Sequence, residues 1–221
     1  MLSYLSSWIY TDKNDDFRHK LTKRLNKQAI NTADLLTKLE ETNSIIAGSY
    51  PLQTILNEEW ESSDLDIFTG NKSMLKYFDQ FYTPYLLTDE KDKYKYTYES
   101  KVVEYKTPTN FKIQVIYSDK FALTSDNIAV KDKVFKHFDF DFCKVGFDGK
   151  TLYVANPKAV KDRKITYDFS KLTMKTYERL LKYEKRGFTL TNRDEFVDKM
   201  IRQGDPDKNF VKKLSDIIST P

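Results

Sequence analysis

The chain has 221 residues, of which 32% are charged, and its formal net charge at pH 7 is +4. This length predicts one large domain or a core with a smaller appendage, and 15 Tyr and 15 Phe residues supply that core, which excludes a disordered chain. The single cysteine, Cys143, excludes an internal disulfide and a cysteine-based zinc site. The weakly positive charge is compatible with an RNA or nucleotide ligand but does not require one.

Nothing in the sequence predicts contact with a membrane. No run of about 18 apolar residues occurs, so we expect no membrane span. Residues 1–9 are mildly apolar but lack a basic leader and a clear cleavage site, so we do not expect a signal peptide. The low cysteine content is consistent with a reducing compartment. We therefore expect a cytoplasmic protein, whose oligomeric state the sequence leaves open.

The spacing of apolar residues predicts alternating helices and strands in the first part of the chain. A spacing near four predicts a helix, and a short apolar or alternating run predicts a strand. The expected elements are helices over residues 16–30 and 33–41, a strand over 44–47, a helix from Pro51, a strand over 64–69 and a helix over 74–82.

The rest of the chain is predicted to begin with strands and to end with helices. We expect strands over 96–100, 102–106 and 111–117, a helix over 126–138, a β-hairpin of 138–147 and 151–155, and helices over 172–184, 193–202 and 209–218. Asp148-Gly149 is a strong signal for the hairpin turn. We therefore expect an α/β (α+β) protein, with a core over residues 1–160 that includes the N-terminal helices and a helical C-terminal part over residues 161–221 packed on that core.

Two short stretches of the expected core carry the most specific chemistry. An apolar strand ends in Gly48-Ser49, where a turn that opens a helix offers backbone N–H groups, a hydroxyl and the positive end of the helix dipole to a phosphate. Asp64 and Asp66 lie two apart at the start of the next strand, so both carboxylates point to one face while Leu65 points into the core. Such a pair is costly to bury unless a cation or hydrogen bonds compensate, so it is a candidate magnesium site.

This pattern resembles the nucleotidyltransferase superfamily that includes DNA polymerase beta, poly(A) polymerases and aminoglycoside nucleotidyltransferases. Its members have an apolar strand, Gly-Gly or Gly-Ser, a short connection, and then Asp-x-Asp or Asp-x-Glu in an apolar strand. Here 14 residues separate Ser49 from Asp64. Residues 138–149 and 182–188 are similar to segments of uncharacterised nucleotidyltransferase-like proteins, several of them encoded by large DNA viruses. The resemblance implies a mixed β-sheet flanked by helices and, for a viral member, a place in the host cytoplasm.

The resemblance also implies a reaction and its ligands. Asp64 and Asp66 would hold two Mg²⁺ (or Mn²⁺) ions that bridge the triphosphate of an NTP, such as ATP, and an acceptor hydroxyl. Gly48 and Ser49 would hold the β- and γ-phosphates. A nucleoside monophosphate would then pass to RNA (a tRNA end, for instance), to a small molecule or to a protein side chain.

The third carboxylate of the superfamily is where the sequence departs from the pattern. It normally lies on the strand that here covers residues 111–117, and the matching residue is Gln114, which is neutral. Asp141 is the strongest candidate to replace it as catalytic residue and metal ligand, ahead of Asp139, and Glu104 on the preceding strand is another source. Without a replacement, the chain would be a degenerate member that binds nucleotide or RNA without turnover.

A basic cluster near the C-terminus is expected to complete the phosphate site. Lys182, Lys185 and Arg186 lie on or just after an expected helix, where relatives place basic residues against the triphosphate. A solvated basic face is the alternative for these residues. Three hypotheses therefore stay open: a metal-dependent nucleotidyltransferase, a non-catalytic binding module of the same fold, and a structural domain whose acids pair with lysines.

Overall fold

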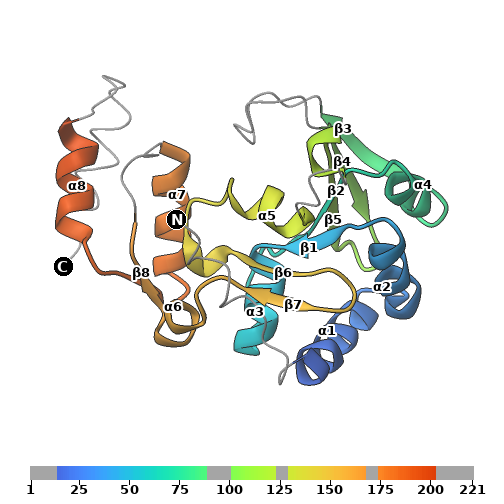
Figure 1. Ribbon diagram of the computed structural model, residues 1–221, viewed down its shortest axis with the longest axis horizontal. Coiled ribbons are helices and arrows are strands. Elements are labelled where there is room, and N and C mark those ends of the chain that lie inside the picture. Colours follow the sequence, from blue (N-terminus) through green and yellow to red (C-terminus); the bar gives the residue numbers. More distant parts are fainter. Residues whose placement is uncertain (1–13, 89–100, 123–128, 168–173, 203–221) are drawn as a thin grey trace. The chain divides into compact units, whose positions relative to one another are not determined.

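The computed structural model describes residues 14–88, 101–122, 129–167 and 174–202. The chain divides into two compact units, Met1–Asp162 and Arg163–Pro221, and each is described by itself. Figure 1 shows the elements of both units. None of the helices within the described ranges is long and apolar enough to cross a bilayer.

A seven-stranded sheet with the order β3-β4-β5-β2-β1-β6-β7 forms the centre of the first unit (Figure 1). Its strands are β1 (Ile45–Ala47), β2 (Leu65–Thr69), β3 (Pro84–Thr88), β4 (Lys101–Lys106), β5 (Lys112–Tyr117), β6 (Val145–Phe147) and β7 (Leu152–Val154). The pair β2 and β5 is parallel, whereas the remaining neighbours are antiparallel. The prediction of an α/β fold with a mixed sheet is confirmed.

Helices cover both faces of this sheet, as the sequence predicts. They are α1 (Asn14–Lys27), α2 (Thr32–Glu41), α3 (Ser49–Leu56), α4 (Ser73–Asp79), α5 (Val130–Phe135) and α6 (Pro157–Asp162), with short 3-10 helices η2 (Asp119–Phe121) and η3 (Asp141–Cys143). On one face, Tyr105 of β4 lies 5.4 Å from Phe78 of α4, and Phe147 of β6 lies 5.1 Å from Phe17 of α1, both between ring centroids. Val102 of β4 points to the opposite face and joins a buried cluster that includes residues of α5.

Helix α1 shows how the sequence fixes the position of charged residues next to the sheet. Phe17, Leu21 and Leu25 recur every four residues and are at most 2% exposed. Fully burying each such side chain contributes about 1.5–3 kcal/mol, so this stripe determines which side of the helix faces the core. Arg24 and Lys27 lie in the last turn, where the helix dipole favours positive charge.

The predicted β-hairpin is correct in its second half and wrong in its first. Asp148 accepts hydrogen bonds from the backbone N–H groups of Lys150 (2.9 Å) and Thr151 (2.6 Å), which fixes the turn between β6 and β7. Residues 138–144 do not continue the strand but form an irregular segment that contains η3. Strand β6 pairs with β1 in the antiparallel direction, and β1 ends at Ala47, which is aligned with Gly146. Residues before Val145 therefore have no residue of β1 opposite them.

Other differences concern segments with weak patterns. Strand β3 was not predicted, because Pro84 opens it and it has no clear alternation. The expected helix over 126–138 is shorter, and its described part is α5. The predicted strand over 96–100, the start of that helix and the predicted helix over 209–218 lie outside the described residues.

The described part of the second unit contains two helices and two short strands. These are α7 (Met174–Glu184), α8 (Arg193–Arg202), β8 (Lys164–Ile165) and β9 (Thr189–Leu190), and β8 pairs with β9 in parallel. The sequence predicts the helices but not the strands, which are only two residues long. Phe196 of α8 packs against Tyr167 and Tyr177, with ring centroids 5.5 and 6.1 Å apart.

Candidate functional site

Strand register places a row of polar side chains on one face of the central sheet. Asp66 of β2 is aligned with Gln114 of β5, and Gln114 is aligned with Glu104 of β4. Aligned residues of neighbouring strands point to the same face. Asp64 and Lys112 each precede a member of the row by two residues and therefore share this face. We call these five residues the carboxylate row.

The turn at Gly48 brings the start of α3 to the same place. Gly48 has φ 89° and ψ −133°, and its N–H donates to the carbonyl of Val145 at 2.9 Å. A Cβ at this position would lie 3.9 Å from Oδ2 of Asp66, so the turn passes directly beside that carboxylate. Ser49 begins α3 and is 9% exposed. The two halves of the sequence motif thus meet in the structure, although 14 residues separate them along the chain.

Lys112 is the main electrostatic partner of the row. Its Nζ lies 3.1 Å from Oδ2 of Asp64 and 3.8 Å from Oε1 of Glu104. Burial lowers the pKa of Lys112, but attraction to Asp64, Glu104 and Asp66 outweighs burial and raises the pKa above its usual value. Gln114, which is 1% exposed, donates a hydrogen bond from Nε2 to Oε1 of Glu104. The Lys112 ammonium therefore lies between Asp64 and Glu104 and offsets part of the negative charge of the row.

The donor chemistry of the row fits a hard divalent cation. Asp64 and Asp66 supply carboxylate oxygens, and Mg²⁺ binds to one or two carboxylates together with phosphate oxygens and water. The Oδ1 atom of Asp66 is buried and accepts no hydrogen bond from the described residues, while the carboxylate as a whole attracts Lys112. Among the described residues, no group of three or more His, Cys, Asp or Glu side chains is arranged to hold a metal ion.

The structure places the candidates for a third carboxylate in different surroundings. Glu104 belongs to the row, and its side chain is only 7% exposed. Asp141 begins η3, has a side chain that is 59% exposed, and lies 2.5 Å from Nζ of Lys144. Asp139 lies in the turn before η3 and is half-buried. Asp141 as a third ligand therefore stays a prediction, and the structure places Glu104, another of the predicted candidates, beside Gln114.

The predicted basic cluster lies in the second unit. Lys182 of α7 and Lys185, just after it, are exposed. The guanidinium of Arg186 lies 5.2 Å from the ring of Tyr183, and its carbonyl accepts a hydrogen bond from Arg163 at 3.0 Å. These contacts are all within the second unit, so a role of these residues against a triphosphate stays a prediction.

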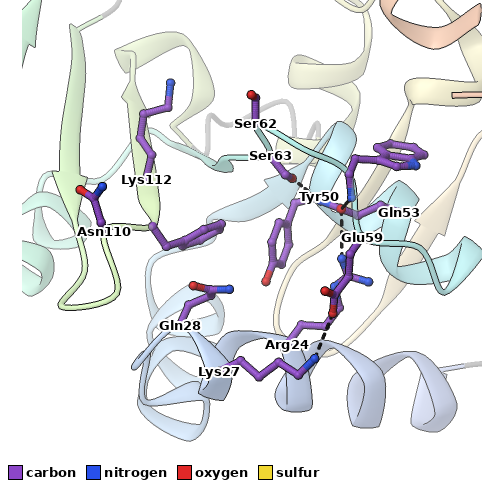
Figure 2. A pocket seen from close by; sticks show the side chains of 12 residues that line it. Arg24, Lys27, Gln28, Tyr50, Gln53, Glu59, Ser62, Ser63, Asn110 and Lys112 are labelled. Carbon is purple, nitrogen blue, oxygen red and sulfur yellow. Dashed lines mark hydrogen bonds and ion pairs between the residues drawn. The ribbon is translucent and has the colours of Figure 1, made fainter. Parts of the chain in front are cut away.

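A pocket of about 400 Å³ adjoins the carboxylate row, and sequence reasoning did not find it. It lies where β2 and β5 begin, because Ser63 just before β2 and Lys112 at the start of β5 both line it. We call it the α1 pocket; its lining includes Arg24, Lys27, Tyr50, Glu59, Phe111 and Lys112. Figure 2 shows Tyr50 near the centre, with Asn110 and Lys112 on one side and the α1 residues on another. These residues come from segments far apart in the sequence, and no local motif joins them.

Gln53 of α3 fixes the loop on one side of this pocket. It is 1% exposed, and its Oε1 accepts hydrogen bonds from Arg24 and from the backbone N–H of Trp60, each at 3.0 Å. Its Nε2 donates to Oγ of Ser63. One buried amide therefore holds α1, the loop after α3 and the residue before Asp64 together, so the pocket is preformed.

Several solved structures with a similar fold are those of CCA-adding enzymes. A complex of such an enzyme with CTP matches with a TM-score of 0.60 and 16% identity, over 84% of this chain and 46% of that chain. The Thermotoga maritima enzyme complexed with tRNA gives 0.56 and 16%, over 83% and 45%, and a complex with ATP gives 0.55 and 12%, over 89% and 50%. The chain thus spans about half the length of these enzymes. At this identity, the likeness shows the fold alone.

The fold of the first unit is therefore of the nucleotidyltransferase type that CCA-adding enzymes have. A family model described as Gabija anti-defense 2 family protein matches residues 13–164, which is more than half of the chain. The chain belongs to the Gabija anti-defense 2 family. No curated protein matches it.

Proposed function

We propose that the protein is a metal-dependent nucleotidyltransferase that transfers a nucleoside monophosphate from an NTP to a hydroxyl. The observation that carries this proposal is that Asp66 lies beside the Gly48 turn. A carboxylate that can bind a metal ion is thereby close to the N-terminus of α3, and helix N-termini of this kind bind phosphate. In the reaction, the acceptor oxygen bonds to the α-phosphorus, the bond from that phosphorus to the α–β bridging oxygen breaks, pyrophosphate leaves, and the hydroxyl proton passes to solvent.

Each half of the site would have its own part in this reaction. Asp64 and Asp66 would hold Mg²⁺ or Mn²⁺, which when bound stabilises the negative charge on the phosphoryl oxygens. Ser49 and the first N–H groups of α3 would hold the β- and γ-phosphates. Gly48 suits this role because its positive φ allows the backbone to approach both Asp66 and the substrate.

For the third acid of the site, the observations favour Glu104 over Asp141. Glu104 is buried on the face that carries Asp64 and Asp66, next to Gln114 at the superfamily position. Asp141 is mostly exposed, and its carboxylate is neutralised by Lys144. For the phosphate side, we propose Lys182, Lys185 and Arg186 as further contacts, on the basis of the superfamily resemblance alone.

The family relationship suggests what this transfer would serve. The family is described as anti-defense against Gabija, so we propose that nucleotidyl transfer by this protein inactivates the Gabija defence. Expression of the wild-type chain in cells that carry the defence would then abolish protection. An Asp64→Asn/Asp66→Asn variant expressed to the same level should leave protection intact, and loss of protection with both proteins would refute a role for transfer.

A non-catalytic binding module is the second candidate, and one observation favours it. Gln114 replaces an acid, and Lys112 already pairs with Asp64 and Glu104, so the row has less negative charge available for metal ions than a two-metal site uses. Such a module would bind an NTP without forming a product.

A labelling experiment separates the two candidates. The full chain is incubated with α-labelled NTPs, Mg²⁺ or Mn²⁺, and in separate reactions RNA, the small-molecule fraction of a cell extract, or its proteins. A transferase labels one of these fractions, and the Asp64→Asn/Asp66→Asn variant labels none. Binding of the NTP without any labelled product would support the module instead.

A further inference from the structure

The α1 pocket has the size and position of a second substrate site. Its volume of about 400 Å³ lies within the usual range for small-molecule pockets. Lys112 lines the pocket and also reaches Asp64 at 3.1 Å, while Ser63 lines it and directly precedes Asp64. A ligand held here would lie within one side-chain length of the carboxylate row. Gly48 and Ser49 are not among the described residues that line the pocket. The α1 pocket is therefore distinct from the proposed triphosphate site.

The charge of the lining suits an anionic group such as a phosphate monoester. Arg24 and Lys27 are cationic and Glu59 is anionic, while the ammonium of Lys112, which also lines the pocket, is shared with Asp64 and Glu104. A phosphate monoester carries about −1.5 to −2 at pH 7. The Nζ of Lys27 lies 3.0 Å from Glu59, and this exposed pair can open to a competing anion. Arg24 is held in place by Gln53, and a guanidinium has more N–H donors than that bond uses.

The ring of Phe111 suits a planar group attached to that phosphate. Phe111 is partly exposed, whereas Tyr50 is 3% exposed and packs against it with ring centroids 5.6 Å apart. The guanidinium of Arg24 lies 5.6 Å from the Tyr50 ring. Nucleobases stack on an accessible aromatic ring without strong preference for one base. Gln28 and Asn110 also line the pocket and bring amide donors and acceptors that can meet the edge of a base.

We propose that the α1 pocket binds a nucleoside monophosphate unit and is the acceptor site of the enzyme. Its phosphate lies against Arg24 and Lys27, and its base lies against Phe111, which Tyr50 supports. The role as acceptor site rests on the proposed transferase function, whereas the binding of the nucleotide does not. The ligand is either a free nucleotide or the end of an RNA strand, because both present the same chemical unit.

Calorimetric titration of the full chain with AMP, in the absence of any NTP, tests this proposal. AMP should bind at least about tenfold more tightly than adenosine, because the phosphate makes charge-assisted hydrogen bonds. Lys27→Gln should weaken AMP binding about tenfold, whereas Lys23→Gln, which removes a lysine of the same helix outside the pocket, should change it by less than about twofold. Equal binding of AMP and adenosine, or equal effects of the two lysine variants, would overturn the proposal.

Two further variants test whether the effects on AMP binding arise from partial unfolding or from the carboxylate row, and a competition experiment identifies the ligand. Glu59→Gln removes the competing acid and should tighten AMP binding, a gain that partial unfolding cannot produce; weaker binding would count against the pocket. The Asp64→Asn/Asp66→Asn variant should bind AMP at least as tightly as the wild type does, because it removes negative charge beside Lys112, so the pocket can stand even if transferase activity is never found. A short oligoribonucleotide that displaces AMP identifies a strand end as the ligand, and one that does not displace it identifies the free nucleotide.

Discussion

Replacement of Lys112 by methionine tests whether the carboxylate row is a cation site. Methionine keeps an unbranched side chain on β5 but removes the charge that faces Asp64 and Glu104. Without metal, two or more carboxylates then remain close together with no counter-charge, and the first unit should become less stable. With Mn²⁺ or Mg²⁺ present, the metal can take over this neutralisation, so the loss should be smaller.

The size of the effect follows from the distances. At an effective dielectric constant of ~20, unit charges 3.1 Å apart attract by about 5 kcal/mol and those 3.8 Å apart by about 4 kcal/mol. The side chain of Lys112 is 37% exposed, so screening and regained hydration cancel most of this sum. Exposed pairs contribute about 0.2–1 kcal/mol and breaking a buried pair costs about 3–5 kcal/mol, so we expect a net loss of about 2 kcal/mol and a fall in Tm of about 4–8 °C.

Thermal unfolding with and without millimolar Mn²⁺ measures this prediction. Lys144→Met is the matched control, because Lys144 also pairs with an aspartate, Asp141, but that carboxylate is 59% exposed. We expect this control to lose less than about 1 kcal/mol and to respond to Mn²⁺ as the wild type does. If Lys112→Met unfolds at the wild-type temperature, or if Mn²⁺ stabilises both proteins equally, Lys112 does not occupy a cation site.

Three further predictions concern the third acid, the turn and the pocket. Glu104→Gln should lower nucleotidyl transfer about 100-fold or more, as expected for loss of a charged group at a reaction centre, while Asp141→Asn stays within about threefold; the reverse order in a labelling assay would assign the role to Asp141. Gly48→Ala should destabilise the protein by about 1–3 kcal/mol in chemical denaturation, because φ 89° is strained for any residue with a Cβ, and a change below about 0.5 kcal/mol would show that the turn relaxes freely. Burial raises the pKa of Tyr50 from 10.0 to about 12, so its contribution to stability is complete below pH 10 and is lost as the pH rises towards 12, by about 3 kcal/mol. Tyr50→Phe should flatten that part of the alkaline unfolding curve, and an unchanged curve would contradict the assignment.

Much of the fold could be predicted because its elements carry strong local patterns. Phe17, Leu21 and Leu25 define the buried side of α1, and the apolar runs around Ile45 and Val115 define central strands. The sequence also predicts the facing of Asp64 and Asp66, since strand periodicity alone determines it. The errors fall where tertiary contacts decide. Residues 138–144 have a strand-like alternation, but β1 is too short to pair with them.

The rest of the site depends on register, which a single sequence does not reveal. Glu104 lies beside Gln114 only because β4 pairs with β5 in one antiparallel register. Lys112 likewise had no local feature to distinguish it from the other lysines of the chain. The α1 pocket joins Arg24 and Lys27 to Phe111 through packing of the last turn of α1 beside the start of β5, a long-range contact with no spacing to detect.

The fate of two labels most directly tests the claim that the protein is a nucleotidyltransferase. The chain is incubated with its acceptor fraction, Mn²⁺, and an NTP labelled either at the α- or at the γ-phosphate, beside the Asp64→Asn/Asp66→Asn variant. We predict that the wild type transfers the α-label to the acceptor and releases the γ-label as pyrophosphate, and that the variant does neither. Transfer of the γ-label, or equal labelling by wild type and variant, would contradict this account.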